Sequence, residues 1–120
     1  MNTYILEKRT TEEIWFDIDC TNILNDSEII ASISSIDSDQ AGLIFLGEAI
    51  NPNPVNFSDG HQAKAGSVIS LQIKGGIIQA SQTNQLYTIR AVFVTNESNI
   101  KEATVLLNVT NIPSQTGREC

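Results

Sequence analysis

An alternation of apolar and polar side chains with a period of two most constrains the fold of this chain. It is clearest over residues 87–95, where apolar side chains occupy every second position from Tyr87 to Phe93 while Thr88 and Arg90 stand between them. Because successive side chains of a β-strand point to opposite faces, this pattern is typical of a strand with one buried face. We therefore expect residues 87–95 to form a half-buried strand.

A second alternation follows over residues 103–110, with apolar side chains at every second position from Ala103 to Val109. Residues 96–99, which lie between the two alternating segments, are Asn, Glu, Ser and Asn. These residue types are frequent in turns because their side chains bond to nearby backbone groups. The two segments are therefore predicted to form a β-hairpin.

Three further segments are predicted to be strands, namely residues 27–36, 42–47 and 67–74. They are short and rich in β-branched or apolar residues, and glycine or polar residues bound them, which favours strands over helices. Residues 37–40 and 51–54 are expected to be loops. The second of these loops contains two prolines, which restrict the backbone and remove hydrogen-bond donors.

Strands of this number and spacing, without a helical pattern, predict an all-β fold. The arrangement we expect is an immunoglobulin-like antiparallel β-sandwich of about seven strands, built from residues 1–110. Tyr87 opens the penultimate strand, where such sandwiches often place a tyrosine whose hydroxyl bonds to nearby backbone. Residues 111–120 are mostly polar and aperiodic, and we expect them to form a C-terminal tail.

Composition and charge exclude several classes of protein. The chain has 120 residues, enough for one domain with a core of its own. Lys and Arg number 7 against 14 Asp and Glu, so the formal net charge is -7. Because nucleic acids and anionic membranes repel such a charge, neither is an expected partner.

Neither targeting nor membrane-spanning segments are evident in the sequence. The apolar run near the N-terminus comprises only residues 4–6, much shorter than the core of a signal peptide. A continuous apolar span long enough to cross a membrane is also missing. We expect a chain that is made in the cytoplasm and is soluble, with a buried thiol at Cys20 and a free one at Cys120.

Few residues suit acid–base or metal chemistry. His61 is the only histidine, and we expect it to be a solvated loop residue. Residues 37–39 contain two aspartates but lack the glycine and glutamate that complete a calcium-binding loop, so they are interpreted as an acidic turn. Nucleotide-binding, serine-hydrolase and CxxC motifs do not occur. The sequence therefore predicts neither catalysis nor a cofactor or metal.

The only tryptophan lies in another predicted strand. Even-numbered residues from Phe16 to Cys20 are expected to face the core, and Trp15, Asp17 and Asp19 to face outward. Two neighbouring carboxylates can serve as acid and base, but we interpret this pair as the outer face of a sheet. An outward tryptophan is suited to anchoring a protein interface, although a core position at a strand bend is an alternative.

Several short motifs occur in a characteristic order along the chain. They are Glu13, Phe16, Ile18, Asp19, Leu24, Asp26 and residues 28–32, 71–76, 87–89, Thr95 and 107–109. In this order the chain resembles small immunoglobulin-like virion proteins of tailed bacteriophages, many of which are called fiber-tail adaptor proteins. The resemblance covers residues 7–110. It departs from the family at Cys20, where tryptophan is usual, and at residues 77–86, which are longer than the family's turn.

The resemblance implies a non-catalytic virion component that attaches fibers or spikes to the tail or neck. Its partners would be tail, neck or fiber proteins, it would be present in multiple copies, and it would be made in the bacterial cytoplasm and located in the virion. A capsid decoration protein bound to the major capsid protein is an alternative, and a carbohydrate-binding β-sandwich module is an alternative of another class. The interface candidates are Trp15, Asp17, Asp19, Ile77, Ile78 and Ile112.

Overall fold

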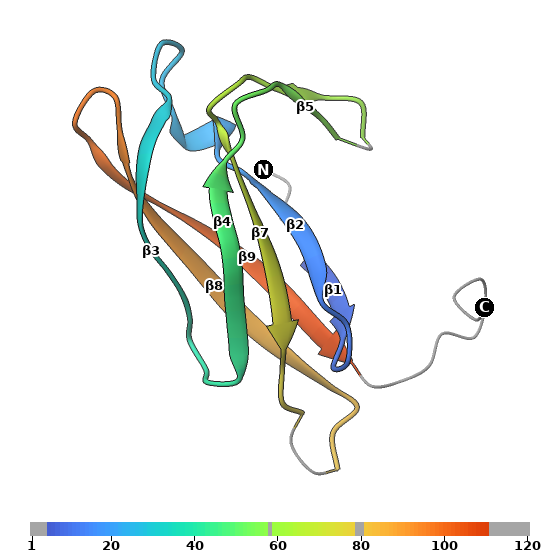
Figure 1. Ribbon diagram of the computed structural model, residues 1–120. Helices are drawn as coiled ribbons and strands as arrows, with labels where there is room; N and C mark the ends of the chain where they lie inside the picture. The colour runs from blue at the N-terminus through green and yellow to red at the C-terminus, as the bar shows by residue number, and fades with distance from the viewer. Residues whose placement is uncertain (1–4, 58, 79–80, 111–120) are drawn as a thin grey trace.

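The computed structural model describes residues 5–57, 59–78 and 81–110, which form an immunoglobulin-like β-sandwich (Figure 1). The strands are β1 (Ile5–Arg9), β2 (Ile14–Asp19), β3 (Ile30–Ser38), β4 (Leu43–Ile50), β5 (Val55–Asn56), β6 (Gln62–Ala63), β7 (Val68–Gly75), β8 (Asn84–Thr95) and β9 (Ile100–Thr110). A single turn of 3-10 helix, η1 (Thr21–Ile23), follows β2. The predicted fold class is confirmed.

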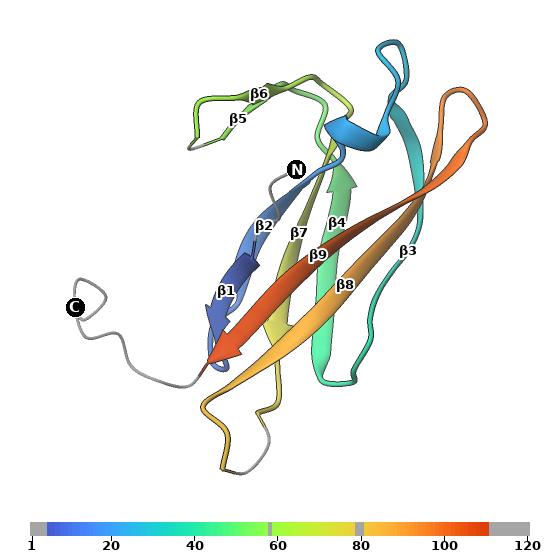
Figure 2. The ribbon, with the colours of Figure 1, turned by 180° about the vertical axis from the view of Figure 1, so that it is seen from behind.

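Two sheets form the layers of the sandwich. One sheet has the order β1-β9-β8-β3 and the other the order β2-β7-β4, while β5 and β6 form a separate small hairpin. Figure 2 shows the four-stranded sheet from its outer side. If β1 is set aside, the order matches the two sheets of an immunoglobulin domain. The prediction of an antiparallel sandwich holds for every pair but one, because β1 runs parallel to β9.

The predicted hairpin is confirmed as β8 and β9, and both strands begin three residues earlier than expected. Strand β3 begins later than predicted and continues through Ser38, so the first half of the expected loop at residues 37–40 belongs to a strand. The sequence did not predict β1 or the β5–β6 hairpin. No helix among the described residues is long and apolar enough to cross a membrane.

Strand β3 shows why its boundaries were difficult to predict. Ile30, Ile33 and Ile36 are its most buried apolar residues, and they are three positions apart. Register shifts between Ile30 and Ser32 and between Ile33 and Ser35 add an extra residue at each place. Because a β-bulge restores the orientation that an odd spacing would reverse, the three isoleucines face the same side.

The core lies between the two sheets and is formed by inward side chains of both. Its fully buried members include Ile69, Leu71, Phe93 and Leu107. Cys20 is also buried as a free thiol, as expected, and burial raises its pKa to about 12, with Asp19 adding to the effect. Cys120 and the expected tail at residues 111–120 lie outside the described residues.

Tyr87 connects the start of β8 to the segment after β7. Its hydroxyl accepts a hydrogen bond from the backbone N of Ile77 (2.7 Å) and donates one to the backbone O of Ile77 (3.0 Å). The expected hydrogen bonding of the Tyr87 hydroxyl to nearby backbone is confirmed, although β8 begins three residues before Tyr87. Gly42 packs beside this hydroxyl, since a Cβ at Gly42 would lie 3.1 Å from it.

Lys8 is buried on the inward side of β1, which the sequence did not indicate. Its Nζ donates to the backbone oxygens of Arg9 and Gly75, each at 2.6 Å. Burial lowers the pKa of this amine, although Glu12 and Glu13 oppose the effect. The side chain thereby supplies the polar partner that the carbonyl at the end of β7 needs inside the sandwich.

Candidate interaction surfaces

Trp15 lies across the outer face of the three-stranded sheet. It stands opposite Gln72 of β7, which in turn stands opposite Leu46 of β4. The indole reaches as far as Gly47, because a Cβ added there would lie 2.9 Å from Cη2 of Trp15. Trp15 is 59% exposed, so one part of the ring lies on the sheet while another faces solvent. The prediction that Trp15 faces outward is confirmed.

A bulge in β4 makes room for this ring. The register between β4 and β7 shifts between Leu46 and Ala49, and Gly47 has a φ of 64°. Glycine adopts this left-handed conformation without the steric cost of a Cβ, and the same lack of a side chain lets the indole approach the backbone. The position of Trp15 therefore depends on a glycine on another strand.

The neighbours of Trp15 extend this region into an apolar surface with polar edges. Ile44 and Leu46 are both exposed on β4. Ile44 stands opposite Lys74 of β7, and Asp17 of β2 accepts a hydrogen bond from the hydroxyl of Ser70 (2.6 Å). Apolar side chains centred on an aromatic residue are typical of protein-binding sites. We call this region the Trp15 surface, consisting of Trp15, Ile44, Leu46, Gly47 and Gln72.

A buried carboxylate organises one end of the sandwich. Glu28 lies just before β3, is fully buried, and accepts hydrogen bonds from Lys101 Nζ (2.7 Å), Thr95 Oγ1 (2.6 Å) and Asn99 Nδ2 (2.8 Å). The backbone N of Asn25 donates a further bond (3.0 Å). These donors, with Lys101 contributing most, lower the pKa of Glu28 to about 2. The β2–β3 connection is thereby fixed against the β8–β9 turn.

The outside of this end exposes apolar side chains between polar ones. The hydroxyl of Ser27 donates to Glu97 (3.0 Å), and the backbones of Ile29 and Asn96 are joined by a hydrogen bond of 2.9 Å. Ile29 is exposed, and Ile100 is 74% exposed at the start of β9. Both connections lie at the upper end in Figure 1. We call this region the loop-end surface, consisting of Ser27, Ile29, Glu97 and Ile100.

The remaining interface candidates have different environments. Ile77 is exposed after β7, whereas Ile78 is half-buried and packs against the core. Ile78 therefore offers less surface to a partner than Ile77 does. Ile112 lies outside the described residues.

The two candidate aspartates of β2 do not act as a pair. Asp17 bonds to Ser70, whereas Asp19 accepts hydrogen bonds from the backbone N and the hydroxyl of Thr21 (3.0 and 2.6 Å). The second oxygen of Asp19 lies 2.7 Å from Nε2 of His61. These bonds lower the pKa of Asp19 against the opposing effect of burial.

His61 lies in a loop and its side chain is 39% exposed, as expected, but its ring also has contacts that the sequence did not indicate. Its Nδ1 lies 2.5 Å from Asp59, its Nε2 contacts Asp19, and its ring stacks on Phe57 with centroids 4.7 Å apart. The two carboxylates raise the pKa of His61. The sequence indicated a loop at His61, but it did not indicate the contact with Asp19, 42 positions away.

These carboxylates lie on opposite ring nitrogens of His61, so the three side chains form a cluster that is ion-paired when the ring is protonated. Within residues 5–57, 59–78 and 81–110, no group of three or more His, Cys, Asp or Glu side chains is placed to hold a metal ion. Because both nitrogens already face carboxylates, the ring is not positioned to take a proton from a hydroxyl or thiol nucleophile.

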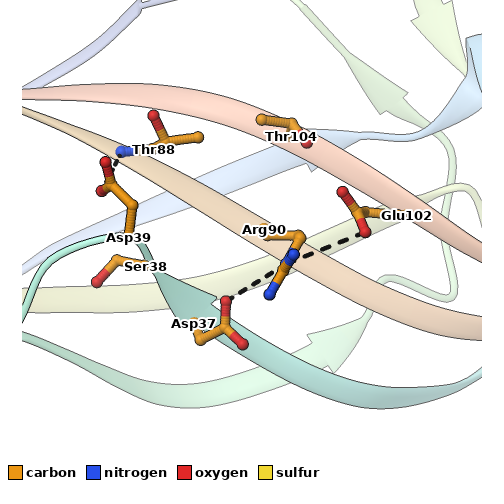
Figure 3. A pocket seen from close by; sticks show the side chains of 7 residues that line it. All are labelled: Asp37, Ser38, Asp39, Thr88, Arg90, Glu102 and Thr104. Carbon is orange, nitrogen blue, oxygen red and sulfur yellow. Dashed lines mark hydrogen bonds and ion pairs between the residues drawn. The ribbon is translucent and has the colours of Figure 1, made fainter.

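The outer face of the four-stranded sheet has a shallow polar depression of about 280 Å³ (Figure 3). Arg90 lies between Asp37 (3.6 Å) and Glu102 (4.0 Å), and Asp39 accepts a hydrogen bond from the backbone N of Thr88 (2.9 Å). The acidic side chains of residues 37–39 therefore bind separate partners. Since exposed ion pairs contribute little free energy and no apolar residue lines the depression, it is a weak candidate for ligand binding.

Comparison with known proteins gives no further guidance. No protein-family model matches this chain, and no curated protein matches it.

Proposed function

We propose that this protein is a non-catalytic virion component of a tailed bacteriophage, an adaptor that attaches fibers or spikes to the tail or neck. The observation that carries the proposal is a sandwich with two separate surfaces that expose apolar side chains, one around Trp15 and one at the loop end. A protein that joins two others needs two binding sites that can be occupied at once. The motif order described above supports the virion setting, and the partners would be tail, neck or fiber proteins.

The Trp15 surface and the loop-end surface are separated along the strands. Trp15 stands opposite Gln72 in the half of β7 that ends at Gly75, whereas the β2–β3 connection follows Asp19, which stands opposite Val68. The four residue steps from Trp15 to Asp19 correspond to about 13 Å of extended strand. The connections next to the loop-end surface lie at the upper end of the sandwich (Figure 1). The two surfaces are therefore offset along the strands and belong to different elements of the sandwich.

The two surfaces also have the physical properties of binding sites. Trp15 provides a large aromatic side chain that lies against Gly47, and burial of such anchors dominates the energy of many interfaces. The loop-end surface is preorganised by Glu28, so little conformational entropy is lost when it binds. Multiple copies in a symmetric particle would strengthen modest individual contacts.

The test uses particles of the phage that encodes this chain. Immunogold labelling of the protein is expected at the tail vertex, and label spread evenly over the shell would instead indicate the capsid decoration protein. A particle without label would contradict both virion functions.

Surface variants give a sharper separation of these functions. For an adaptor, Trp15→Ser and Ile100→Ser should have different defects. One variant should be missing from particles, and the other should be present on particles that lack fibers. Leu86→Ser, an exposed change on the outer face of β8 away from both surfaces, is the matched control and should leave particles unchanged. Identical defects in the first two variants would contradict a bridging role.

A carbohydrate-binding module is a second candidate because part of the Trp15 indole faces solvent beside the amide of Gln72. Aromatic rings of this kind can stack against the apolar faces of sugars. Trp15 is the only tryptophan, so its fluorescence reports binding directly. A saturable change with neutral oligosaccharides, lost in Gln72→Ala, would favour this candidate over the adaptor.

A further inference from the structure

The β5–β6 hairpin projects from the upper end of the sandwich in both ribbon views (Figures 1 and 2). It contains only two residue pairs, Val55 with Ala63 and Asn56 with Gln62. A two-stranded hairpin is marginally stable at best in water, even when it is longer than this. Its position must therefore depend on the contacts that hold it to the sandwich.

One of those contacts is the ion-paired cluster around His61. The residue immediately precedes β6, and its Nε2 lies 2.7 Å from Asp19 at the end of β2. Its Nδ1 lies 2.5 Å from Asp59 in the turn of the hairpin, and its ring stacks on Phe57 after β5. The imidazole of His61 thus contacts other residues of the hairpin turn and also joins the turn to the sandwich.

The chemistry of this cluster depends on a single proton. A neutral imidazole carries one N–H, whereas an imidazolium carries two, and ionised carboxylates can only accept. Asp19 and Asp59 can therefore both receive a hydrogen bond from His61 only when the ring is protonated. With a neutral ring, one carboxylate would face a nitrogen lone pair, which is repulsive.

We propose that His61 is a proton-operated latch that holds the β5–β6 hairpin against β2 and releases it when the ring loses its proton. The sandwich remains folded when the latch opens, because Asp19 keeps its bonds to Thr21 and the core does not include His61. The latch is a conformational device independent of the adaptor function.

The direction of the pH dependence follows from the charged groups around the ring. Asp19 from β2 and Asp59 from the hairpin turn are the two charges that act on His61, and both raise its pKa. A group whose pKa is higher in the folded state stabilises that state fully below its unfolded pKa, which is about 6.5 for histidine. The stabilisation is lost as the pH rises through the folded pKa. The hairpin is therefore closed at acidic pH and released on the alkaline side.

Nuclear magnetic resonance on the intact protein tests the latch. The His61 ring signals give its pKa, and hydrogen-exchange protection factors of Phe57 and Gly60 report the hairpin, because both amides are bonded within its turn. We expect the pKa to exceed the ordinary histidine value. The protection factors should fall about tenfold across the titration, the change expected from losing one charge-assisted hydrogen bond, while those of β8 amides stay constant.

Variants separate the latch from a general effect of charge. His61→Gln should abolish the pH dependence of the Phe57 and Gly60 protection factors, and Asp59→Asn should lower the His61 pKa. Asp17→Asn, which removes a carboxylate from the same strand without touching His61, is the control and should leave the titration unchanged. A wild-type pKa at or below the ordinary value, or hairpin protection that does not change across the titration, would overturn the proposal.

Discussion

Replacing Tyr87 with phenylalanine tests how the end of the sandwich is held together. The change removes one oxygen atom that both accepts from and donates to the backbone of Ile77. Each hydrogen bond contributes about 0.5–1.5 kcal/mol net, so the two together contribute about 1–3 kcal/mol. Because Ile77 is exposed, water can reach part of its freed backbone. We therefore expect a loss of about 1–2 kcal/mol in the free energy of unfolding.

Urea unfolding followed by circular dichroism measures this loss, and thermal unfolding gives a second value. An unfolding entropy of about 2.1 cal/mol/K per residue corresponds to a decrease in Tm of about 4–8 °C for a chain of this length. Thr104→Val, which removes an exposed hydroxyl from β9, is the matched control and should change stability by less than about 0.5 kcal/mol. If Tyr87→Phe costs no more than the control, the hydroxyl does not hold this corner, and the reasoning is refuted.

Two further predictions concern the interaction surfaces. Glu28→Gln should destabilise the protein and make its stability depend less on pH in acid. The stabilisation from a carboxyl with a pKa of about 2 is complete above its unfolded pKa and is lost as the pH falls through 2. Urea unfolding midpoints between pH 2 and 7 measure this dependence, and a variant as acid-sensitive as the wild type would contradict the prediction. Gly47→Ala should cost about 1–2 kcal/mol from backbone strain and change Trp15 fluorescence, whereas Gly60→Ala, with a φ of 95° and open space around its Cβ, should cost stability without changing the fluorescence. Identical emission spectra for the two glycine variants would mean that the ring does not rest on Gly47.

The sequence predicted the parts of the fold that depend on local alternation. Strands β7, β8 and β9 and the turn between the last two follow from a period of two and from turn residues. Strand β1 was missed because it is short and because Lys8, a charged residue, occupies an inward position. Only the fold shows that carbonyl oxygens of Arg9 and Gly75 accept its amine protons.

The candidate sites were less predictable because they depend on distant partners. Trp15 was identified by residue type and strand parity, but the glycine beneath it belongs to another strand. Glu28 bonds to residues 67 to 73 positions away, so nothing in its local sequence distinguished it from an exposed glutamate. Contacts between loops that meet at one end of a sandwich follow from topology, and local pattern carries little information about them.

The core between the two surfaces bears on how an adaptor of this kind would position its partners. The Trp15 surface lies on β2, β7 and β4, and the loop-end surface is fixed by Glu28 to the β8–β9 turn, so the core between the sheets connects them. Close-packed cores resist deformation, and the two surfaces should therefore keep a constant separation. A fiber attached through such a domain would be held at a defined position relative to the tail. A flexible linker would give the same attachment without fixing that position. If the fiber must be held at a defined position, a folded sandwich suits the bridging role better than a linker does.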